Sequence, residues 1–142
     1  MTTVQQVLEA KGPEVCRCSP NEPVLNAIKM MADRDIGSVM VMDDDRLLGM
    51  FTERHYSRNV FLKGRSSPNT PIREVMATEL VAVGPERTVE ECMALMTEKR
   101  VRHLPVMRGR RLVGVISIGD LVKSIIADQK FTIEQLERFI HG

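Results

Sequence analysis

A hydroxyl and a carboxylate three residues apart are the side chains of this sequence best suited to hold a small polar ligand. They stand in the run Gly114-Val-Ile-Ser117-Ile-Gly-Asp120, where a strand is expected to pass into a helix. The first turn of a helix offers backbone N–H groups and a dipole that favour an anion. A carboxylate one turn later can accept both hydrogens of a ribose cis-diol. Ser117 for phosphate and Asp120 for ribose therefore predict a nucleotide site.

The same pattern occurs a second time, as Gly49-Met-Phe-Thr52-Glu-Arg-His55. Thr52 again supplies a hydroxyl, but His55 stands where the other run has Asp120. An imidazole offers at most one acceptor, so it cannot receive both diol hydrogens. We therefore expect one good nucleotide site per chain. A second cleft, with Thr52, His55 and Val101, is expected to be empty, weak or used differently.

Basic side chains precede the hairpin of the same copy, in the run Arg100-Val-Arg102-His103-Leu-Pro105. Arg102 and His103 are candidates to meet a phosphate. The alternative is a solvated helix end whose cations complement the helix dipole. Ser117 and Asp120 likewise have a structural alternative, in which they only cap the helix and favour its first turn. The hydroxyl at the equivalent position of the other copy argues for a binding role.

Patterns for catalysis and for metal binding fit poorly. Ser117, His103 and Asp120 suggest a hydrolase triad, but a nucleophile elbow needs glycine where Val115 stands. The run from Gly109 to Gly114 lacks the Lys and Ser/Thr of a P-loop. The three cysteines lack a second Cys/His pair at zinc-ligand spacing. We predict no catalytic residue, no metal site and no required cofactor.

An internal repeat contains both motifs. A shift of 65 positions aligns residues 20–56 with 85–121 without a gap, and eight of the 37 pairs are identical. About two identities are expected by chance from ordinary composition. A unit of about 60 residues buries too little surface to be stable alone. We therefore expect the two copies to pack sheet to sheet about a pseudo-two-fold axis, which leaves two equivalent clefts.

Each copy predicts the element order β-α-β-β-α, so the fold class is α/β (α+β). The helices show apolar residues at i, i+3, i+4 and i+7, and tight polar turns join the short strand pairs. The expected elements of the first copy are an extended piece at 15–18, a helix from Val24, strands at 38–42 and 46–51, and a helix from Glu53. Those of the second copy are an extended piece at 80–83, a helix from Val89, strands at 103–107 and 111–116, and a helix from Ile118.

Segments outside the repeats complete the expected organisation. The stretch between the copies is rich in Ser, Pro and Gly, which is typical of a linker. Thr132 and Gln135 form a capping-box pattern that predicts the start of a last helix. We expect an N-terminal helical turn in 1–12, the first repeat in 13–63, the linker in 64–74, the second repeat in 75–127 and a C-terminal helix in 128–142.

Composition excludes several classes of partner. The net charge is +1, which gives no whole-chain electrostatic case for nucleic acid or an anionic membrane. Aromatic residues are 4% of the chain and Trp is absent, so a stacking platform for single strands is hard to build. No apolar run approaches the roughly 18–20 residues of a membrane span. The N-terminus lacks a secretion signal, and three cysteines are too few for a disulfide framework. We expect a cytoplasmic protein.

With these motifs and this element order, the chain resembles a tandem pair of CBS domains, also called a Bateman module. The resemblance covers roughly residues 13–127 and rests on both Gly-h-h-Ser/Thr-x-x-Asp-type motifs, the strand around Arg102 to Val106 and the element order. One pair with short terminal helices is similar to the small stand-alone CBS proteins of bacteria and to the plant CBSX type.

The resemblance implies a non-catalytic module that binds an adenosine-containing ligand. AMP is the leading candidate, with ADP, ATP, NAD and S-adenosylmethionine as alternatives. It implies that Ser117 and Asp120 hold phosphate and ribose, with Arg102 and His103 near the phosphate. It also implies a homodimer through the CBS modules and a regulated partner protein of unknown identity. Adenine would lie against Val15, Ile36 and Ile116.

Three hypotheses of different classes follow. The first is an adenine-nucleotide sensor that changes the behaviour of a partner, with the tail helix 132–141 as a candidate transmitter. The second is a dimerisation scaffold with vestigial sites, and the third is a weak enzyme. The sensor is preferred, because Ser117, Asp120, Arg102 and His103 occur together in one copy.

Overall fold

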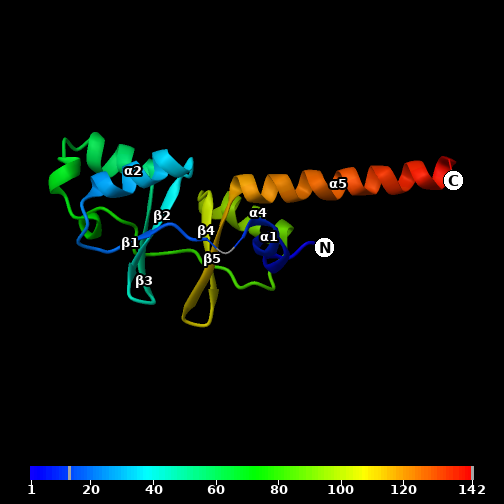
Figure 1. The fold of residues 1–142 in the computed structure, drawn as a ribbon, viewed down its shortest axis with the longest axis horizontal. Coiled ribbons are helices and arrows are strands. Elements are labelled where there is room, and N and C mark those ends of the chain that lie inside the picture. Colours follow the sequence, from blue (N-terminus) through cyan, green and yellow to red (C-terminus); the bar gives the residue numbers. More distant parts are fainter. Residues whose placement is uncertain (13, 142) are drawn as a thin grey trace. The chain divides into compact units, whose positions relative to one another are not determined.

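The structure is a computed structural model that describes residues 1–12 and 14–141. The expected repeat boundary at residue 13 and the expected helix end at residue 142 lie outside the described residues. Helices and short strands alternate along the chain (Figure 1), which confirms the mixed α/β class.

The first copy forms a three-stranded sheet in the order β1-β2-β3. Strand β1 pairs with β2 in parallel, and β2 pairs with β3 as an antiparallel hairpin. Asp44 adopts a positive φ of 51° in the turn of this hairpin, a conformation that Asp tolerates better than most residues. The elements are β1 (Arg17–Cys18), α2 (Val24–Arg34), β2 (Ser38–Asp43), β3 (Arg46–Thr52), α3 (Glu53–His55) and a π-helical turn (Tyr56–Phe61).

The second copy contains α4 (Val89–Lys99), the hairpin β4 (His103–Arg108) with β5 (Arg111–Ser117), and α5 (Ile118–His141). Helix α4 begins with the reciprocal capping box of Thr88 and Glu91 that its sequence indicates. The expected strand at 80–83 is wrong, because its pairing stops at a single parallel bridge between Val83 and Val106.

A proline explains the missing strand. In the first copy, Met40 N–H donates to the Cys16 carbonyl at 2.9 Å and ties β1 to β2. The aligned residue of the second copy is Pro105, which has no N–H to donate. The Pro105 carbonyl still accepts from Val83 N–H at 3.1 Å, so one hydrogen bond forms and the ladder ends there.

The separate last helix expected from Thr132 is also wrong, because α5 runs without a break from Ile118 to His141. The Thr132 hydroxyl donates to the Asp128 carbonyl at 3.0 Å within the helix. This i−4 bond is the usual way in which a threonine is accommodated in a helix interior. The capping pattern is therefore present in sequence but is not used.

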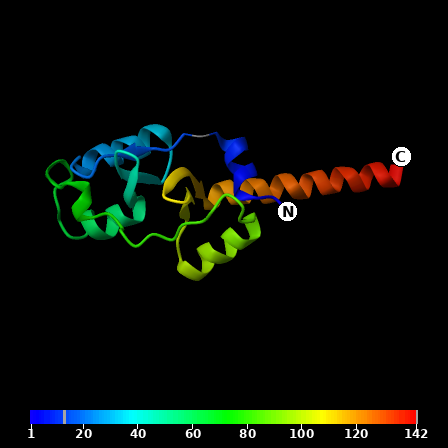
Figure 2. The same ribbon diagram turned by 90° about the horizontal axis from the view of Figure 1, so that it is seen from below.

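The chain divides into two units. Each unit contains most of one copy, together with a short leading segment that lies in the sequence just before the other copy. The first unit comprises residues 1–13, 82–106 and 114–142, and the second comprises 14–81 and 107–113. Helix α1 (Val4–Lys11) thus packs in the unit of the second copy, beside the beginning of α5 (Figures 1 and 2).

Matching hydrogen bonds show that the two leading segments are equivalent. The Thr2 carbonyl accepts from Val89 N–H, and the Thr70 carbonyl accepts from Val24 N–H, both at 2.9 Å. Val4 and Ile72, each two residues further along, are both fully buried. The expected linker 64–74 is therefore not a free connection, since its later part completes the core of the second unit.

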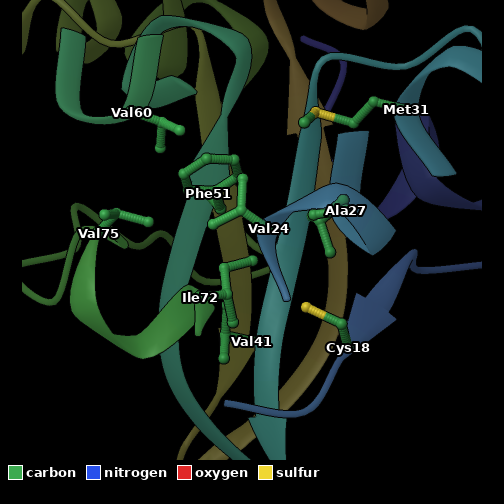
Figure 3. Close-up of a cluster of buried hydrophobic side chains, with 10 residues drawn as sticks. Cys18, Val24, Ala27, Met31, Val41, Phe51, Val60, Ile72 and Val75 are labelled. Atoms are coloured by element: carbon green, nitrogen blue, oxygen red, sulfur yellow. The ribbon is translucent and has the colours of Figure 1, made fainter. Parts of the chain in front are cut away.

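The core of the second unit lies between the sheet, α2 and this leading segment (Figure 3). Phe51 on β3 and Ile72 have no exposed surface. Burying side chains of this size contributes roughly 1.5–3 kcal/mol each. The buried cluster consists of Cys18, Val24, Ala27, Met31, Val39, Val41, Phe51, Val60, Ile72 and Val75.

The glycine that opens each motif makes room for the leading segment. A Cβ on Gly114 would lie 2.6 Å from Leu8 Cδ2. A Cβ on Gly49 would lie 2.6 Å from Met76 Sδ and 2.7 Å from the Ala77 carbonyl oxygen. These glycines are required for packing against the leading segments.

We predict that Gly49→Ala lowers the free energy of unfolding by about 2–3 kcal/mol, whereas Gly114→Ala lowers it by about 1 kcal/mol. The Leu8 side chain can turn away from a new methyl group. The Ala77 backbone cannot, because its N–H and carbonyl are both hydrogen-bonded to Met50 at 2.9 Å. Urea unfolding of both variants measures the difference. Equal losses would contradict this explanation, and Leu8→Ala should offset part of the loss only in Gly114→Ala.

Candidate ligand-binding site

Ser117 and Asp120 form a reciprocal pair at the start of α5. Ser117 N–H donates to Asp120 Oδ2 at 2.8 Å, and Asp120 N–H donates to Ser117 Oγ at 3.2 Å. The structural alternative, a helix cap, is therefore realised. The pair also fixes the carboxylate in one orientation, and the Ser117 O–H keeps its hydrogen for another acceptor.

Lys11, at the end of α1, completes this site. Its Nζ donates to Asp120 Oδ2 and to the Val115 carbonyl, both at 2.8 Å. The exposed fractions of the side chains are 35% for Lys11 and 16% for Asp120. Burial alone raises the pKa of Asp120, but the hydrogen bonds from Lys11 and Ser117 and the charge of Lys11 outweigh it and lower that pKa. Asp120 is therefore an anion at neutral pH.

The amide groups at this helix end are partly engaged. Ile118 N–H donates to the Arg102 carbonyl at 2.9 Å, in addition to the N–H groups of Ser117 and Asp120 described above. The expected anion site made of amides is thus smaller than the sequence suggests. The same bond brings the backbone of Arg102 beside the motif, and its side chain is exposed. The phosphate contacts expected for Ser117, Arg102 and His103 stay predictions.

The remaining predicted contacts are distributed over both units. His103 is half-buried at the start of β4, and Ile116 on β5 is fully buried, both in the first unit. Val15 and Ile36 are half-buried and belong to the second unit. The adenine contacts expected for Val15, Ile36 and Ile116 stay predictions.

The first copy repeats the cap with an imidazole in place of the carboxylate. Thr52 N–H donates to His55 Nδ1 at 3.1 Å, and His55 N–H donates to Thr52 Oγ1 at 3.2 Å. Since Nδ1 accepts, the hydrogen of a neutral ring is on Nε2. The one acceptor of the ring is therefore already used, which strengthens the expectation that this motif does not hold a ribose. Val101, expected beside it, is half-buried in the first unit.

We predict that His55 makes the protein less stable below about pH 6.5. Burial lowers the pKa of His55 from 6.5, and the charges of Arg54 and Arg58 lower it further. The unfolded chain then binds the proton more readily, so stability rises with pH through this range. The contribution is fully present above pH 6.5 and is lost as pH falls through the folded pKa. His55→Gln should flatten the unfolding free energy between pH 5 and 7; an unchanged slope would assign it to other groups.

Lys11 is the site residue that the sequence interpretation missed. The contact of Lys11 with Asp120 depends on the packing of α1 beside α5, and these two helices are far apart in the sequence. A signal for that packing exists: Thr2–Leu8 resembles Thr70–Met76, with Thr and Val identical at two positions and apolar pairs at two more. That similarity has an offset of 68 positions, three more than the repeat itself.

The cysteines are unsuited to reactive chemistry. All three are free thiols, and Cys18 and Cys92 are buried. Burial, with the nearby Glu22 and Cys16 adding to it, raises the pKa of Cys18 to about 12.

Among residues 1–12 and 14–141, no group of three or more His, Cys, Asp and Glu side chains is placed to hold a metal ion. In the same residues, no helix combines the length and hydropathy that crossing a membrane requires.

Comparison with known proteins identifies the family of the chain. The sequence model described as "CBS domain" matches residues 12–61 and 72–127. The mitochondrial CBS domain-containing protein CBSX3 of Arabidopsis thaliana is 33% identical over 150 residues, covering 99% of this chain and 73% of the relative. A solved structure of a candidate signal-transduction protein with CBS domains from Burkholderia ambifaria is 50% identical, with a TM-score of 0.86, and covers 90% of this chain and 96% of that one.

A more distant structure shows the same fold with ligands. The CBS domain pair of protein MJ0100, solved in complex with 5′-methylthioadenosine and S-adenosyl-L-methionine, is 18% identical with a TM-score of 0.78. The superposition covers 90% of this chain and 98% of that one. Two matched repeats and relatives that extend over nearly all of the chain lead to one conclusion: this protein belongs to the CBS-domain family, as a tandem pair.

Proposed function

We propose that the protein is a non-catalytic regulatory module that binds an adenosine-containing ligand at the Ser117–Asp120 motif. The observation that carries the proposal is the Asp120 carboxylate, anionic and mostly buried, which Ser117 holds at the start of α5. A carboxylate so placed can accept the two hydroxyl hydrogens of a ribose. The Ser117 hydroxyl and Arg102 supply the phosphate contacts. AMP is the ligand we place first, before ADP, ATP, NAD and S-adenosylmethionine.

Lys11 gives the proposed site a way to report occupancy. In the structure its ammonium group bridges α1 to Asp120 and to β5. A ribose diol that uses both oxygens of the Asp120 carboxylate brings one hydroxyl to Oδ2, where it competes with this ammonium. Ligand binding therefore changes the contact between α1 and α5, and a regulated partner can respond only to such a difference between the two states.

Thermal unfolding of the purified protein against each candidate ligand tests the proposal. A ligand that binds only the native state stabilises it by about 2.7 kcal/mol at a hundredfold excess over its dissociation constant. For a chain of this size the midpoint should rise by about 5–10 °C. A rise with one adenosine compound and none with GMP supports the proposal. No rise with any adenosine compound contradicts it.

The finer parts of the proposal concern assembly and compartment. We infer a homodimer through the CBS modules, a regulated partner protein and no nucleic-acid or membrane ligand. The near-neutral net charge of +1 supports the last point. The free thiols of all three cysteines support the cytoplasm.

A dimerisation scaffold is the second candidate function. The observation that favours it is the apolar surface on α5, where Phe139 and Ile140 are 87% and 73% exposed. A scaffold without a ligand would show self-association and no thermal response to any nucleotide.

A further inference from the structure

The second half of α5 is an exposed helix. Every residue from 126 to 141 is exposed, and the helix extends beyond α1 and α4, which lie beside its beginning (Figures 1 and 2). A bond from Thr2 Oγ1 to Asp128 Oδ2, at 2.7 Å, ties it to the N-terminal segment. Isolated helices shorter than about 12–15 residues are marginal in water. This segment is hardly longer, so a partner surface would stabilise it considerably.

Apolar residues on this segment follow the spacing of a coiled coil. Six positions recur at alternating steps of four and three, which puts them on one seam of the helix. Five of the six are apolar, and Gln129 is the exception. The apolar members are 42–73% exposed. The seam consists of Val122, Ile126, Gln129, Ile133, Leu136 and Ile140.

We propose that this seam pairs with the same seam of a second copy, as an antiparallel two-helix coiled coil. A two-fold axis at residue 131 matches every seam position with another. Val122 then meets Ile140 of the partner subunit, Ile126 meets Leu136 of the partner subunit, and Gln129 meets Ile133 of the partner subunit.

Flanking charges select the antiparallel direction. In that direction Lys123 lies opposite Glu137 of the partner subunit, and symmetry forms this ion pair twice. Lys130 meets its own copy near the axis, which is one unfavourable contact against two favourable ones. In a parallel pair, Lys130 and Glu137 would instead face Ile125 and Thr132 of the partner subunit, and no ion pair would form.

The charge of the helix favours a protein over a membrane as the occupant. Between residues 118 and 141 there are three Lys and Arg residues against four Asp and Glu. Helices that bind anionic membranes carry an excess of basic residues on the polar face. The contact is separate from the homodimer through the CBS modules and independent of the ligand site.

Two substitutions to glutamine test the seam. Leu136 lies on it, whereas Phe131 is an apolar residue of the same helix on the opposite side, with 63% of its surface exposed. We expect Leu136→Gln to abolish one doubling step of association of the full chain, as measured by light scattering after size-exclusion chromatography over a range of concentrations. Phe131→Gln should keep the wild-type mass. If the two variants have the same mass, the seam is not the contact.

Charge reversal tests the direction. Lys123→Glu and Glu137→Lys each place like charges opposite each other at two symmetric positions, so each should weaken association by about tenfold. The double variant restores both ion pairs and should recover the wild-type dissociation constant. Failure of this recovery would overturn the antiparallel arrangement. A wild-type chain that stays monomeric at this helix but sediments with phosphatidylserine vesicles would overturn self-pairing altogether.

Discussion

Replacing Asp120 by asparagine should remove the thermal response to the adenosine ligand while leaving the fold intact. The asparagine Oδ1 can still accept from Ser117 N–H, as Asp120 Oδ2 does at 2.8 Å, so the helix cap survives. Its amide group is a donor, however, and cannot accept a second ribose hydrogen. Hydrogen bonds to a charged group contribute about 1.5–3 kcal/mol each. The expected weakening of binding is therefore about 100-fold or more.

Lys11→Met is the matched control for this variant. It removes the same 2.8 Å ion pair from the other side and keeps the carboxylate. Because the ammonium competes with the ribose hydroxyls, binding should tighten by about two- to fivefold. Both variants lose the ion pair and one binds better, so a loss confined to Asp120→Asn is due to the ribose contact. Equal affinity of Asp120→Asn and the wild type, measured by calorimetry, would refute the proposed site.

Local patterns predicted most of the fold because each repeat contains its own signals. The helices at Val24 and Val89 follow from apolar periodicity, and both hairpins follow from polar turns between apolar runs. The predictions that were wrong concern segments whose structure depends on residues of another segment. The strand expected at 80–83 ends because Pro105, which lies in β4, offers no N–H. The linker expected at 64–74 holds Ile72, whose burial depends on the sheet beneath it.

The sequence predicts the Ser117–Asp120 pair of the candidate site, but it does not predict the contact that Lys11 makes with Asp120. Ser117 directly precedes α5 and Asp120 is the third residue of that helix, so their proximity follows from the geometry of a helix cap. Lys11 reaches them over a separation of 109 residues, through a packing arrangement that no local pattern encodes. The cap and the ligand role are alternatives in the sequence; the structure contains the cap, and the ligand role of Asp120 stays a prediction. The cap is what orients Asp120.

Replacing His55 by aspartate should create a second ligand site in the same chain. One oxygen of the introduced carboxylate can take the place of His55 Nδ1, which accepts from Thr52 N–H at 3.1 Å, and the other oxygen is then free for a ribose hydroxyl. The Thr52 hydroxyl corresponds to that of Ser117. Arg54 and Arg58, whose charges lower the pKa of His55, would stabilise both the new carboxylate and a phosphate. Calorimetry should show two ligands per chain instead of one.

Two further variants make this gain specific to the carboxylate. The asparagine of His55→Asn is similar in size to the aspartate and keeps an acceptor for Thr52 N–H. It lacks the second carboxylate oxygen that would accept from the ribose, so this variant should bind one ligand, as the wild type does. The double variant His55→Asp with Asp120→Asn should also bind one ligand, now at the new position. If His55→Asp folds normally and still binds a single ligand, the identity of this side chain is not what separates the two motifs. The difference would then lie in a neighbouring residue: Arg102, whose carbonyl accepts from Ile118 N–H, is aligned with Gly37, which has no side chain to offer a phosphate.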